Sequence, residues 1–444
     1  MRVLVVMRLF SGLADSLADG VWAPRGVPAI YKLLEALADD PEVEPLFVFA
    51  CKDAEVGARV AGRRAVEVDR LGGRVLILPY RRHPWLAALG LDGKFRELNH
   101  LLRCLWIYVR FRPAVSYFTN ANFAAAGIFA RLGLGRMILR FMGLHPEQKR
   151  LAEARGGLQR WLYQAPFDHV VCTQEGSGAE YYLPRLLRPG TPLLIPLNGV
   201  DRRSADPAAV AAIRRRLGRD KRPLVLFIGR LEANKGCDEF VTAMITLLRA
   251  RPGAARAAVV GTGSQYEALA ARVNAEGMTG DILLTGAIPH SEVGAYLHLA
   301  SIYVSLNQFG NLSNANLEAI VAGKCMILPE ADPATHTDEI TERLLPRDVI
   351  ARLARDDLVG GLVKVLRELL DRPQEIARRA AATTALGHRL LDSWDARIAT
   401  EMAIIRGDSS GAAVPVAPGC ATGKTRRRAS VPGRTPVKIR RSTS

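Results

Sequence analysis

Gly310–Gly323, GNLSNANLEAIVAG, is the stretch that decides the fold of this chain. A loop rich in Gly, Asn and Ser runs directly into a helical pattern that carries one carboxylate, Glu318. Upstream, the segment GRLEANKG places Arg230 and Lys235 just after a predicted strand. A helix N-terminus with free amides, together with two cations on a facing loop, is suited to bind a diphosphate. A carboxylate in the first turns of that helix can accept hydrogen bonds from ribose hydroxyls, so the two segments predict a nucleoside-diphosphate site.

Outward from this stretch, short apolar runs alternate with longer helical patterns, which is typical of parallel sheets built from βαβ units. In the first half we expect strands at Arg2–Met7, Pro45–Cys51, Arg74–Pro79, Ala114–Thr119, Met137–Met142, His169–Thr173 and Pro192–Pro196. In the second half we expect them at Leu224–Gly229, Ala257–Gly261, Ile282–Thr285, Ile302–Leu306 and Cys325–Pro329. The turn LNGVD separates the two series. The pattern predicts an α/β chain with two doubly wound domains.

The domain limits follow from the same rhythm. We expect an N-terminal Rossmann-like domain over residues 1–197 and a second one over residues 198–385. The last helices, over residues 386–406, are expected to cross back to the first domain. Residues 407–444 are rich in Gly, Pro, Ser, Thr and Arg and cannot bury enough apolar surface to fold, which predicts a disordered basic tail.

Composition limits the kinds of partner. The chain has 444 residues, of which 49% are hydrophobic, and a net charge of +17. Eight basic and no acidic residues lie within 411–444, so the rest carries +9 (17 − 8), which suits an anionic substrate or a membrane surface. The six cysteines are far apart and form no CxxC motif, which argues against a thiolate metal site and for small buried residues in a reducing compartment.

The N-terminus, MRVLVVMRLF, has too short an apolar run for a signal peptide and is better interpreted as a first buried strand. No uninterrupted apolar run reaches the roughly 18 residues that a spanning helix needs. We therefore expect a cytoplasmic protein, with any contact to the inner face of the membrane being peripheral.

Five segments of the second half resemble, in the same order, the C-terminal domain of the family 4 glycosyltransferases, which have the GT-B fold. They are LIPLNGVD, LVLFIGRLEANKGCDEFV, AVVGTGSQYEALA, LLTGAIPHSEVGAYLHLASIYVSLN and GNLSNANLEAIVAGKCMIL. The first half resembles the family in layout only. The resemblance implies a GT-B fold, in which two Rossmann-like domains face a cleft, the second binds a nucleotide-sugar donor and the first binds the acceptor.

The resemblance also implies roles for residues. Arg230 and Lys235 would neutralise the leaving nucleoside diphosphate without a metal or another cofactor, and Glu318 would hold the ribose. Gly229 and Gly261 would belong to the turns around the donor. The loop before the helix consists of Asn311, Leu312, Ser313 and Asn314. Its backbone amides would face the phosphates, and the side-chain amide of Asn311 or Asn314 would bind a sugar hydroxyl.

The chain departs from the family at one position. The family pattern has two glutamates separated by seven residues; Glu318 is the second, and the first, which contacts the donor sugar, falls on Gly310. Asp332 and Asp338 are too distant in sequence to be assigned as its replacement. The departure leaves open an alternative, a catalytically silent relative that binds a nucleotide sugar or a partner protein.

Candidates in the first half are fewer. Gly26 lies in the loop between the first strand and the first helix, where the family has a glycine-rich loop facing the acceptor and the sugar phosphates. His145 follows the strand MILRFMG, where the family places a functional histidine near the reacting sugar, and Arg140 is a competing candidate. Glu175, in TQEGSGAEYY, either faces the cleft or caps a helix.

The predicted reaction is glycosyl transfer, with retention of anomeric configuration, from a nucleotide-diphospho-sugar to a glycan, a lipid-linked saccharide or a small molecule. A second alternative is another enzyme on the same fold, such as a nucleotide-sugar epimerase or a phosphorylase. The basic tail suits phosphates of nucleic acid or of anionic lipid, and it leaves open a third alternative, a nucleic-acid-binding protein led by its tail. Because it lacks interleaved aromatic residues, we expect lipid contact and no specific nucleic acid. The helix NHLLRCLWIYVRFRP is a second indication of membrane contact, although burial against the sheet would explain its Leu and Trp residues equally well.

Overall fold

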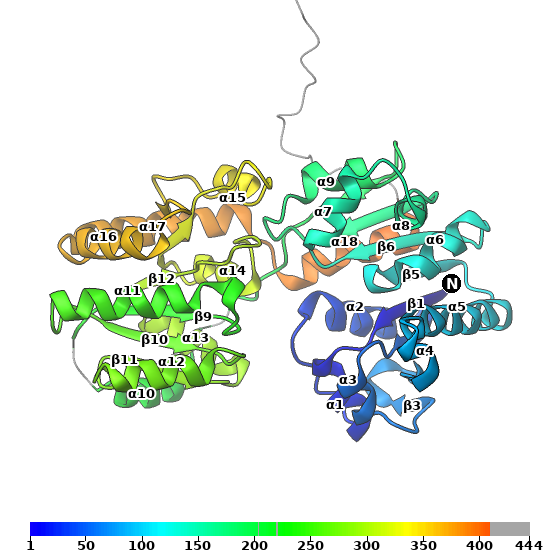
Figure 1. Ribbon diagram of the computed structural model, residues 1–444, viewed down its shortest axis with the longest axis horizontal. Coiled ribbons are helices and arrows are strands. Elements are labelled where there is room, and N and C mark those ends of the chain that lie inside the picture. The colour runs from blue at the N-terminus through cyan, green and yellow to red at the C-terminus, as the bar shows by residue number, and fades with distance from the viewer. Residues whose placement is uncertain (203, 219–220, 409–444) are drawn as a thin grey trace, which may run out of the picture.

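The computed structural model describes residues 1–408 except 203, 219 and 220, and shows two α/β domains side by side (Figure 1). The first domain contains an eight-stranded sheet with the order β3-β4-β2-β1-β5-β6-β7-β8, and the second contains a six-stranded sheet with the order β11-β10-β9-β12-β13-β14. The strands of the first sheet are β1 Arg2–Arg8, β2 Glu44–Ala50, β3 Ala65–Val68, β4 Gly73–Leu78, β5 Val115–Thr119, β6 Arg136–Phe141, β7 His169–Cys172 and β8 Leu193–Leu194. Those of the second are β9 Leu224–Ile228, β10 Arg256–Val260, β11 Ile282–Gly286, β12 Ile302–Val304, β13 Cys325–Pro329 and β14 Ala351–Leu353.

Helices cover both faces of each sheet, which explains why the strands are continuous apolar runs. In β1, Val3, Val5 and Met7 enter one core layer while Leu4 and Val6 enter the other. The first domain has α1 Ser11–Asp19, α2 Pro28–Asp39, α3 Ala54–Arg59, α4 Pro84–Ala88, α5 Asp92–Phe111, α6 Phe123–Arg131, α7 Pro146–Glu153, α8 Leu158–Tyr163 and α9 Ala179–Leu186. Then follow α10 Pro207–Arg216, α11 Cys237–Ala250, α12 Tyr266–Ala275, α13 His290–Leu299, α14 Asn314–Val321, α15 Glu339–Leu344, α16 Leu358–Leu370, α17 Pro373–Leu390 and α18 Trp394–Arg406.

Three elements differ from the sequence expectations. The edge strand β3 was not predicted and is antiparallel to β4, so the first sheet is not purely parallel. The edge strand β14 was also missed, because both edge strands are short and only partly buried and so lack a long apolar run. The segment expected to be a loop after β1 contains α1, whose start has no side-chain cap or acidic residue to indicate it.

The last helix, α18, lies against the first domain beside α2 (Figure 1). Its Glu401 is completely buried and forms ion pairs with Arg140 Nε at 2.9 Å and Arg397 Nη2 at 2.8 Å. The Tyr117 hydroxyl donates to the same carboxylate. Arg140, which sequence reasoning proposed as an alternative sugar contact, is fully buried and engaged by this carboxylate, so that prediction was wrong.

The predicted basic tail lies outside the described residues, apart from Gly407 and Asp408. In the described ranges, no helix is long and apolar enough to cross a membrane.

Candidate active site

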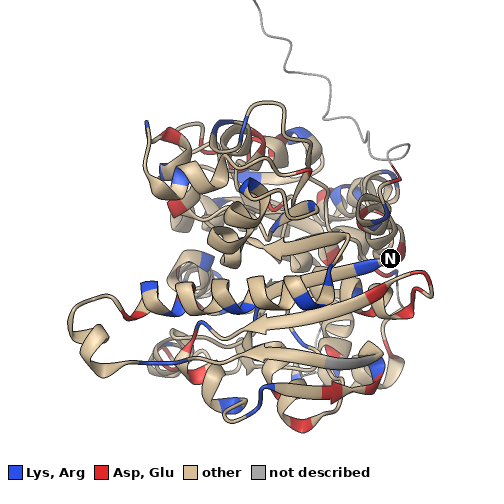
Figure 2. Cartoon of the chain, turned by 90° about the vertical axis from the view of Figure 1, so that its right-hand side faces the viewer, with Lys and Arg blue, Asp and Glu red and all other residues tan. Residues whose placement is uncertain are grey.

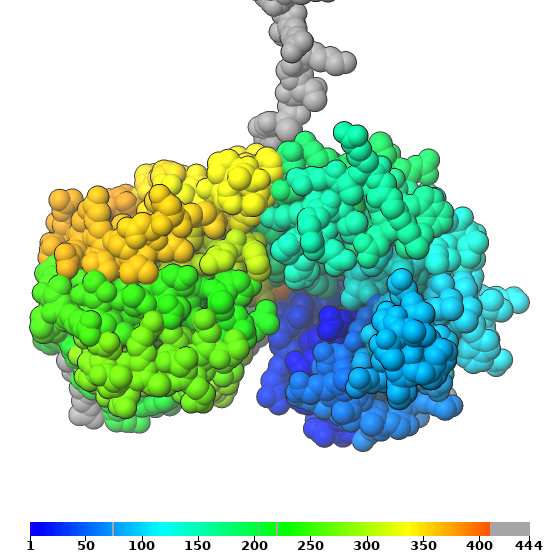
Figure 3. Space-filling model, in the orientation of Figure 1, coloured from blue at the N-terminus to red at the C-terminus, as the bar shows by residue number. Residues whose placement is uncertain are grey.

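The strands of the second sheet all run parallel, so the loops after their carboxyl ends meet at one edge, where open α/β sheets bind ligands. Arg230 and Lys235 follow β9, Gly261 follows β10, and Gly310 follows β12. This edge faces the first domain. Figure 3 shows the surface hollowed between the two lobes, with the blue N-terminal segment on one side and green residues of the second domain on the other.

Glycines set the shape of the loop that carries the two cations. Gly261 has a φ of +136°, and a Cβ there would lie 1.9 Å from the carbonyl oxygen of Gly229. The Leu231 amide donates to the Thr262 carbonyl at 2.9 Å, which ties the β9 loop to the β10 loop. At Gly236, with a φ of +73°, a Cβ would lie 2.3 Å from the Leu306 Cβ. The predicted glycines Gly229 and Gly261, together with Gly236, which was not predicted, therefore hold protein loops together at the sheet edge.

The two cations differ in their surroundings. Arg230 is exposed, and Lys235 is partly buried at the end of a 3₁₀ turn over Ala233–Lys235. Burial lowers the pKa of Lys235, Arg230 lowers it further, and Glu175 of the first domain opposes the shift. A bound anion would stabilise both cations, which is what the diphosphate prediction requires.

Glu318 lies one turn into α14 with 23% of its side chain exposed. Burial raises the pKa of this carboxyl, and His290 opposes the rise. The His290 Nε2 lies 3.6 Å from Glu318 Oε1. Sequence reasoning missed His290, which starts α13 after β11 and whose position carries no spacing signal.

The loop before α14 does not present all its amides to a ligand, which corrects the sequence prediction. Asn311 and Leu312 are completely buried. The Asn311 amide donates to Asp338 Oδ1 at 2.7 Å, and the Leu312 amide donates to the Glu175 carbonyl at 3.2 Å. These two amides are already used within the protein. Ser313 caps α14 instead, accepting from the Asn316 amide at 3.4 Å.

The side-chain amides of this loop are also engaged. Asn311 Nδ2 donates to the carbonyl of Asn307 at 2.9 Å, and its Oδ1 accepts from Ser305 Oγ at 2.9 Å. Asn314 Oδ1 accepts from Asn198 Nδ2 at 2.7 Å. Asn311 is therefore wrong as a sugar ligand, whereas Asn314 lies at the linker between the domains.

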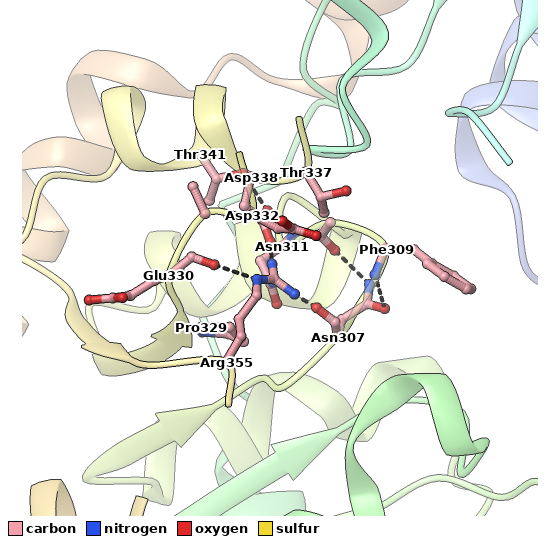
Figure 4. A network of polar contacts seen from close by, with 12 residues as sticks. Asn307, Phe309, Asn311, Pro329, Glu330, Asp332, Thr337, Asp338, Thr341 and Arg355 are labelled. Atoms are coloured by element: carbon pink, nitrogen blue, oxygen red, sulfur yellow. Dashed lines mark hydrogen bonds and ion pairs between the residues drawn. The ribbon is translucent and has the colours of Figure 1, made fainter. Parts of the chain in front are cut away.

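Asp338 organises the loop (Figure 4). Its buried carboxylate accepts from the amide and the side chain of Asn311, from Thr341 Oγ1 and from Arg355 Nη2, each at 2.7 Å. Burial raises the pKa of Asp338, and these hydrogen bonds oppose the rise. The distance in sequence from Gly310 hid this residue, because only the fold brings β13 beside β12.

A loop of the first domain, residues 174–178, closes onto this organised loop. The Asp338 amide donates to the Gly176 carbonyl at 2.7 Å. A Cβ at Gly176 would lie 2.6 Å from Asp338 Oδ1, and a Cβ at Gly310 would lie 2.2 Å from the Glu175 carbonyl oxygen. Gly310 has a φ of +131° as well. The glycine in place of the family's glutamate is thus required by the contact between the domains.

The other candidates of the first domain lie at loops. His145 is exposed at the start of α7, where its amide donates to Gln148 Oε1 at 3.0 Å. Gly26 is exposed with a φ of +101°, and only the Phe10 ring lies within 4 Å of a Cβ built there. Another chain segment approaches Gly12 instead, because a Cβ built there would lie 1.8 Å from the Arg25 carbonyl oxygen.

A cavity of about 390 Å³ also lies between the domains. Its lining includes Lys149 of the first domain and Phe309 and Arg355 of the second. Its lining contains none of the residues predicted to bind the donor. Within the described residues, no group of three or more His, Cys, Asp or Glu side chains is placed to hold a metal ion.

Comparison with known proteins shows which family the second domain resembles. Residues 222–358 match the model of the family described as "Glycosyl transferases group 1". A GDP-mannose-dependent alpha-(1-6)-phosphatidylinositol monomannoside mannosyltransferase of Mycobacterium tuberculosis is 28% identical over 217 residues, 47% of this chain and 54% of that protein. Glycogen synthase of the same organism is 26% identical over 242 residues, 54% of this chain and 53% of that protein.

Solved structures show the same fold. Anabaena HepE in complex with UDP has a TM-score of 0.64 at 13% identity, covering 92% of this chain and 100% of that one. The lipopolysaccharide glycosyltransferase WaaG has a TM-score of 0.58 at 14% identity, covering 91% and 100%. These likenesses confirm the predicted fold of two facing α/β domains, GT-B. The match over residues 222–358 confirms the family resemblance, and this domain is a group 1 glycosyltransferase domain. The chain spans about half the length of the curated relatives named above.

Proposed function

We propose that this protein is a glycosyltransferase that moves a sugar from a nucleotide-diphospho-sugar, with retention of anomeric configuration and without a metal. The observation that carries the proposal is the pair Arg230 and Lys235, held by glycine-shaped loops at the carboxyl edge of a group 1 glycosyltransferase domain. Both cations stabilise charge on the departing diphosphate in a preorganised way. Glu318 accepts hydrogen bonds from the ribose, with His290 beside it.

The first domain supplies the acceptor side of the proposed site. His145 and Gly26 stay candidates there, since both lie on loops at the carboxyl edge of the first sheet. Asn311 and Leu312 are completely buried, so they do not contact the donor. Arg230 and Lys235 bind the phosphates, together with the backbone amides of Ser313 and Asn314.

The acceptor is proposed to be lipid-linked, because α5 exposes an apolar face flanked by basic residues. Trp106 and Leu102 are 62% and 57% exposed, and they continue a stripe at helical spacing that we call the α5 face: Phe95, Leu98, Leu102, Trp106 and Val109. Figure 2 looks onto the side that carries α5 and shows Lys and Arg along the long helix in front. The two acidic side chains of α5 outside the face are paired, Asp92 with Arg96 and Glu97 with Lys52.

An apolar stripe with cationic flanks complements an anionic lipid surface. The Arg110 guanidinium lies 5.2 Å from the centre of the Trp106 ring. Burial lowers the pKa of Arg103, and the positive charges of Arg81 and Arg64 lower it further. We therefore propose that the α5 face contacts the inner leaflet of the membrane. The relatives named as acting on phosphatidylinositol monomannoside support a lipid-linked acceptor.

The donor test is calorimetry with UDP-, GDP- and ADP-sugars on the wild type and on the Arg230→Ala/Lys235→Ala double variant. We expect one nucleotide class to bind the wild type, with affinity reduced at least about 100-fold in the variant, since each charged contact contributes about 1.5–3 kcal/mol. Absence of binding by every nucleotide sugar to a folded wild type would reject the transferase and favour a silent relative.

The membrane test is co-sedimentation with vesicles that contain anionic phosphatidylglycerol or only neutral phosphatidylcholine. We expect Leu102→Gln/Trp106→Gln to reduce binding to anionic vesicles at least about tenfold. The matched control is Val21→Gln, a 65% exposed apolar residue outside the α5 face. Equal vesicle binding by all three proteins would contradict the lipid-surface proposal.

A further inference from the structure

The Glu175 carboxylate lies at the junction of the two domains and has no hydrogen-bond or ion-pair partner among the described residues. It follows β7 by three residues, at the carboxyl edge of the first sheet. Its backbone carbonyl accepts from the Leu312 amide at 3.2 Å, which fixes the residue against the loop before α14. Among the described residues, its side-chain oxygens accept no hydrogen bond and have no cation within 4.0 Å. The helix that follows begins with Gly178 as its N-cap, so Glu175 does not cap it.

Two glycines leave room for Glu175, one for its side chain and one for its backbone. Gly143 follows β6 with a φ of +94°, and a Cβ there would lie 2.3 Å from Glu175 Oε2. Gly310 lies under the Glu175 backbone, as described above. Gly143 therefore leaves the space that the Glu175 side chain occupies, and Gly310 leaves the space for the Glu175 backbone.

Two positive charges, those of Lys235 and Arg140, act on the Glu175 carboxyl. Burial raises the pKa of Glu175 to about 7, and Lys235 and Arg140 oppose the rise. Arg140 is already paired with Glu401 at 2.9 Å. Lys235, the proposed diphosphate cation, has no ion pair within 4.0 Å among the described side chains. Glu175 of the first domain and Lys235 of the second are thus neighbouring opposite charges that form no ion pair within 4.0 Å among the described side chains.

We propose that the Glu175 carboxylate binds hydroxyl groups of the donor's transferred sugar, supplying from the first domain the carboxylate that position 310 lacks. The proposal rests on the proposed function. The sugar is bonded directly to the diphosphate, so a carboxylate of the first domain that neighbours the diphosphate cation Lys235 is placed to reach the sugar ring. A carboxylate with free lone pairs accepts hydrogen bonds from hydroxyls, and such charge-assisted bonds are about twice as strong as neutral ones.

The test compares Glu175→Gln with the wild type by calorimetry, using UDP against UDP-glucose and GDP against GDP-mannose. We expect the variant to bind the nucleoside diphosphate within about twofold of the wild type and to lose about tenfold of affinity for the nucleotide sugar. Turnover of the nucleotide sugar should fall by at least the same factor. The control is Glu67→Gln, which changes an exposed carboxylate on the edge strand β3 and should alter neither affinity.

The outcomes separate this inference from the function on which it rests. If neither diphosphate nor nucleotide sugar binds the wild type, the proposed function fails and the inference fails with it. If the diphosphate binds and Glu175→Gln keeps both the full sugar affinity and the turnover, the inference alone is overturned. Loss of diphosphate affinity equal to the loss of sugar affinity would also overturn it, because that pattern indicates a structural role. Intact sugar affinity with lost transfer to an acceptor would overturn it in favour of an acceptor contact.

Discussion

Gly310 is a residue at which the two domains pack closely, because the Glu175 carbonyl oxygen occupies the space of a side chain. A substitution there must either displace the 174–178 loop or strain its own backbone. Domain packing therefore explains why this position holds a glycine, and the donor-binding test decides between an active transferase and a silent relative.

Gly310→Ala is expected to destabilise the protein by about 2–4 kcal/mol, since it combines a backbone clash with a positive φ. Urea unfolding measures the change. Gly253→Ala is the matched control, because Gly253 has a φ of +75° but no atom within 4 Å of its built Cβ. It should cost only about 1–2 kcal/mol of backbone strain. Equal losses in the two variants would contradict the clash.

Glu175 also predicts a pH dependence of stability. Its pKa in the folded protein is about 7, above the value of 4.5 expected in the unfolded chain, with Lys235 and Arg140 as the charged groups that oppose the shift. The folded state holds the proton that the unfolded state releases, so this stabilising contribution is complete below pH 4.5 and is lost as pH rises through 7. The loss is about 3 kcal/mol, at about 1.4 kcal/mol per pKa unit.

The measurement is the free energy of unfolding at pH 4.5 to 8 for the wild type and Glu175→Gln. The wild type should lose stability relative to the variant across this range, because glutamine does not titrate. Parallel curves would show that the carboxyl has an ordinary pKa.

At the scale of elements, the loops after β7, β12 and β13 form one unit around the Asp338 carboxylate. The carboxylate holds the Asn311 amide on one side and Arg355 on the other, and the Asp338 amide holds Gly176 of the first domain. The loop before α14 is thus fixed before any ligand arrives, which leaves the first amides of the helix itself for an anion.

Asp338→Asn should destabilise the protein by about 3–5 kcal/mol, because it leaves Arg355 without its buried counter-ion and turns one acceptor into a donor. Thermal and urea unfolding report the loss. Asp357→Asn is the control: Asp357 caps α16 by accepting from the Gly360 amide at 2.8 Å, and Asn caps a helix about as well as Asp. A loss as small as that of the control would mean that Asp338 does not organise the loop.

At the scale of the whole molecule, α18 joins the end of the folded chain to the first domain. The buried carboxylate of Glu401 pairs with Arg140 of β6 and Arg397 of α18, and both Arg140 and the carboxylate are fully buried. The first domain is therefore complete only when α18 is present, and the two domains are linked twice, through residues near 198 and through α18.

Glu401→Gln should cost about 3–5 kcal/mol, because it leaves two buried guanidinium groups without their counter-ion. The control is Arg251→Gln, which breaks an exposed pair with Asp371 and should cost less than about 1 kcal/mol. Urea unfolding measures both costs. A cost near that of the control would contradict a bracing role for α18.

A chain that ends at Asp408 should bind nucleotide sugar within about twofold of the full chain, since every proposed donor contact lies before this residue. Calorimetry measures it. Loss of donor binding in the shortened chain would contradict the assignment of the donor contacts to residues before 409. If the main activity is nucleic-acid binding and the shortened chain loses it, the result would favour the alternative of a nucleic-acid-binding protein led by its tail.

The sequence by itself determined what depends on neighbouring residues. Apolar runs located twelve of the strands, and ordered motifs located Arg230, Lys235 and Glu318, because strands, turns and phosphate loops are encoded by short spacings. The positions of Asp338, His290 and Glu175 relative to Gly310 came only from the tertiary structure. Their contacts join residues on different loops and in different domains, and no spacing in the chain encodes such contacts. The same reason explains why two amides predicted to be free, those of Asn311 and Leu312, are used within the protein.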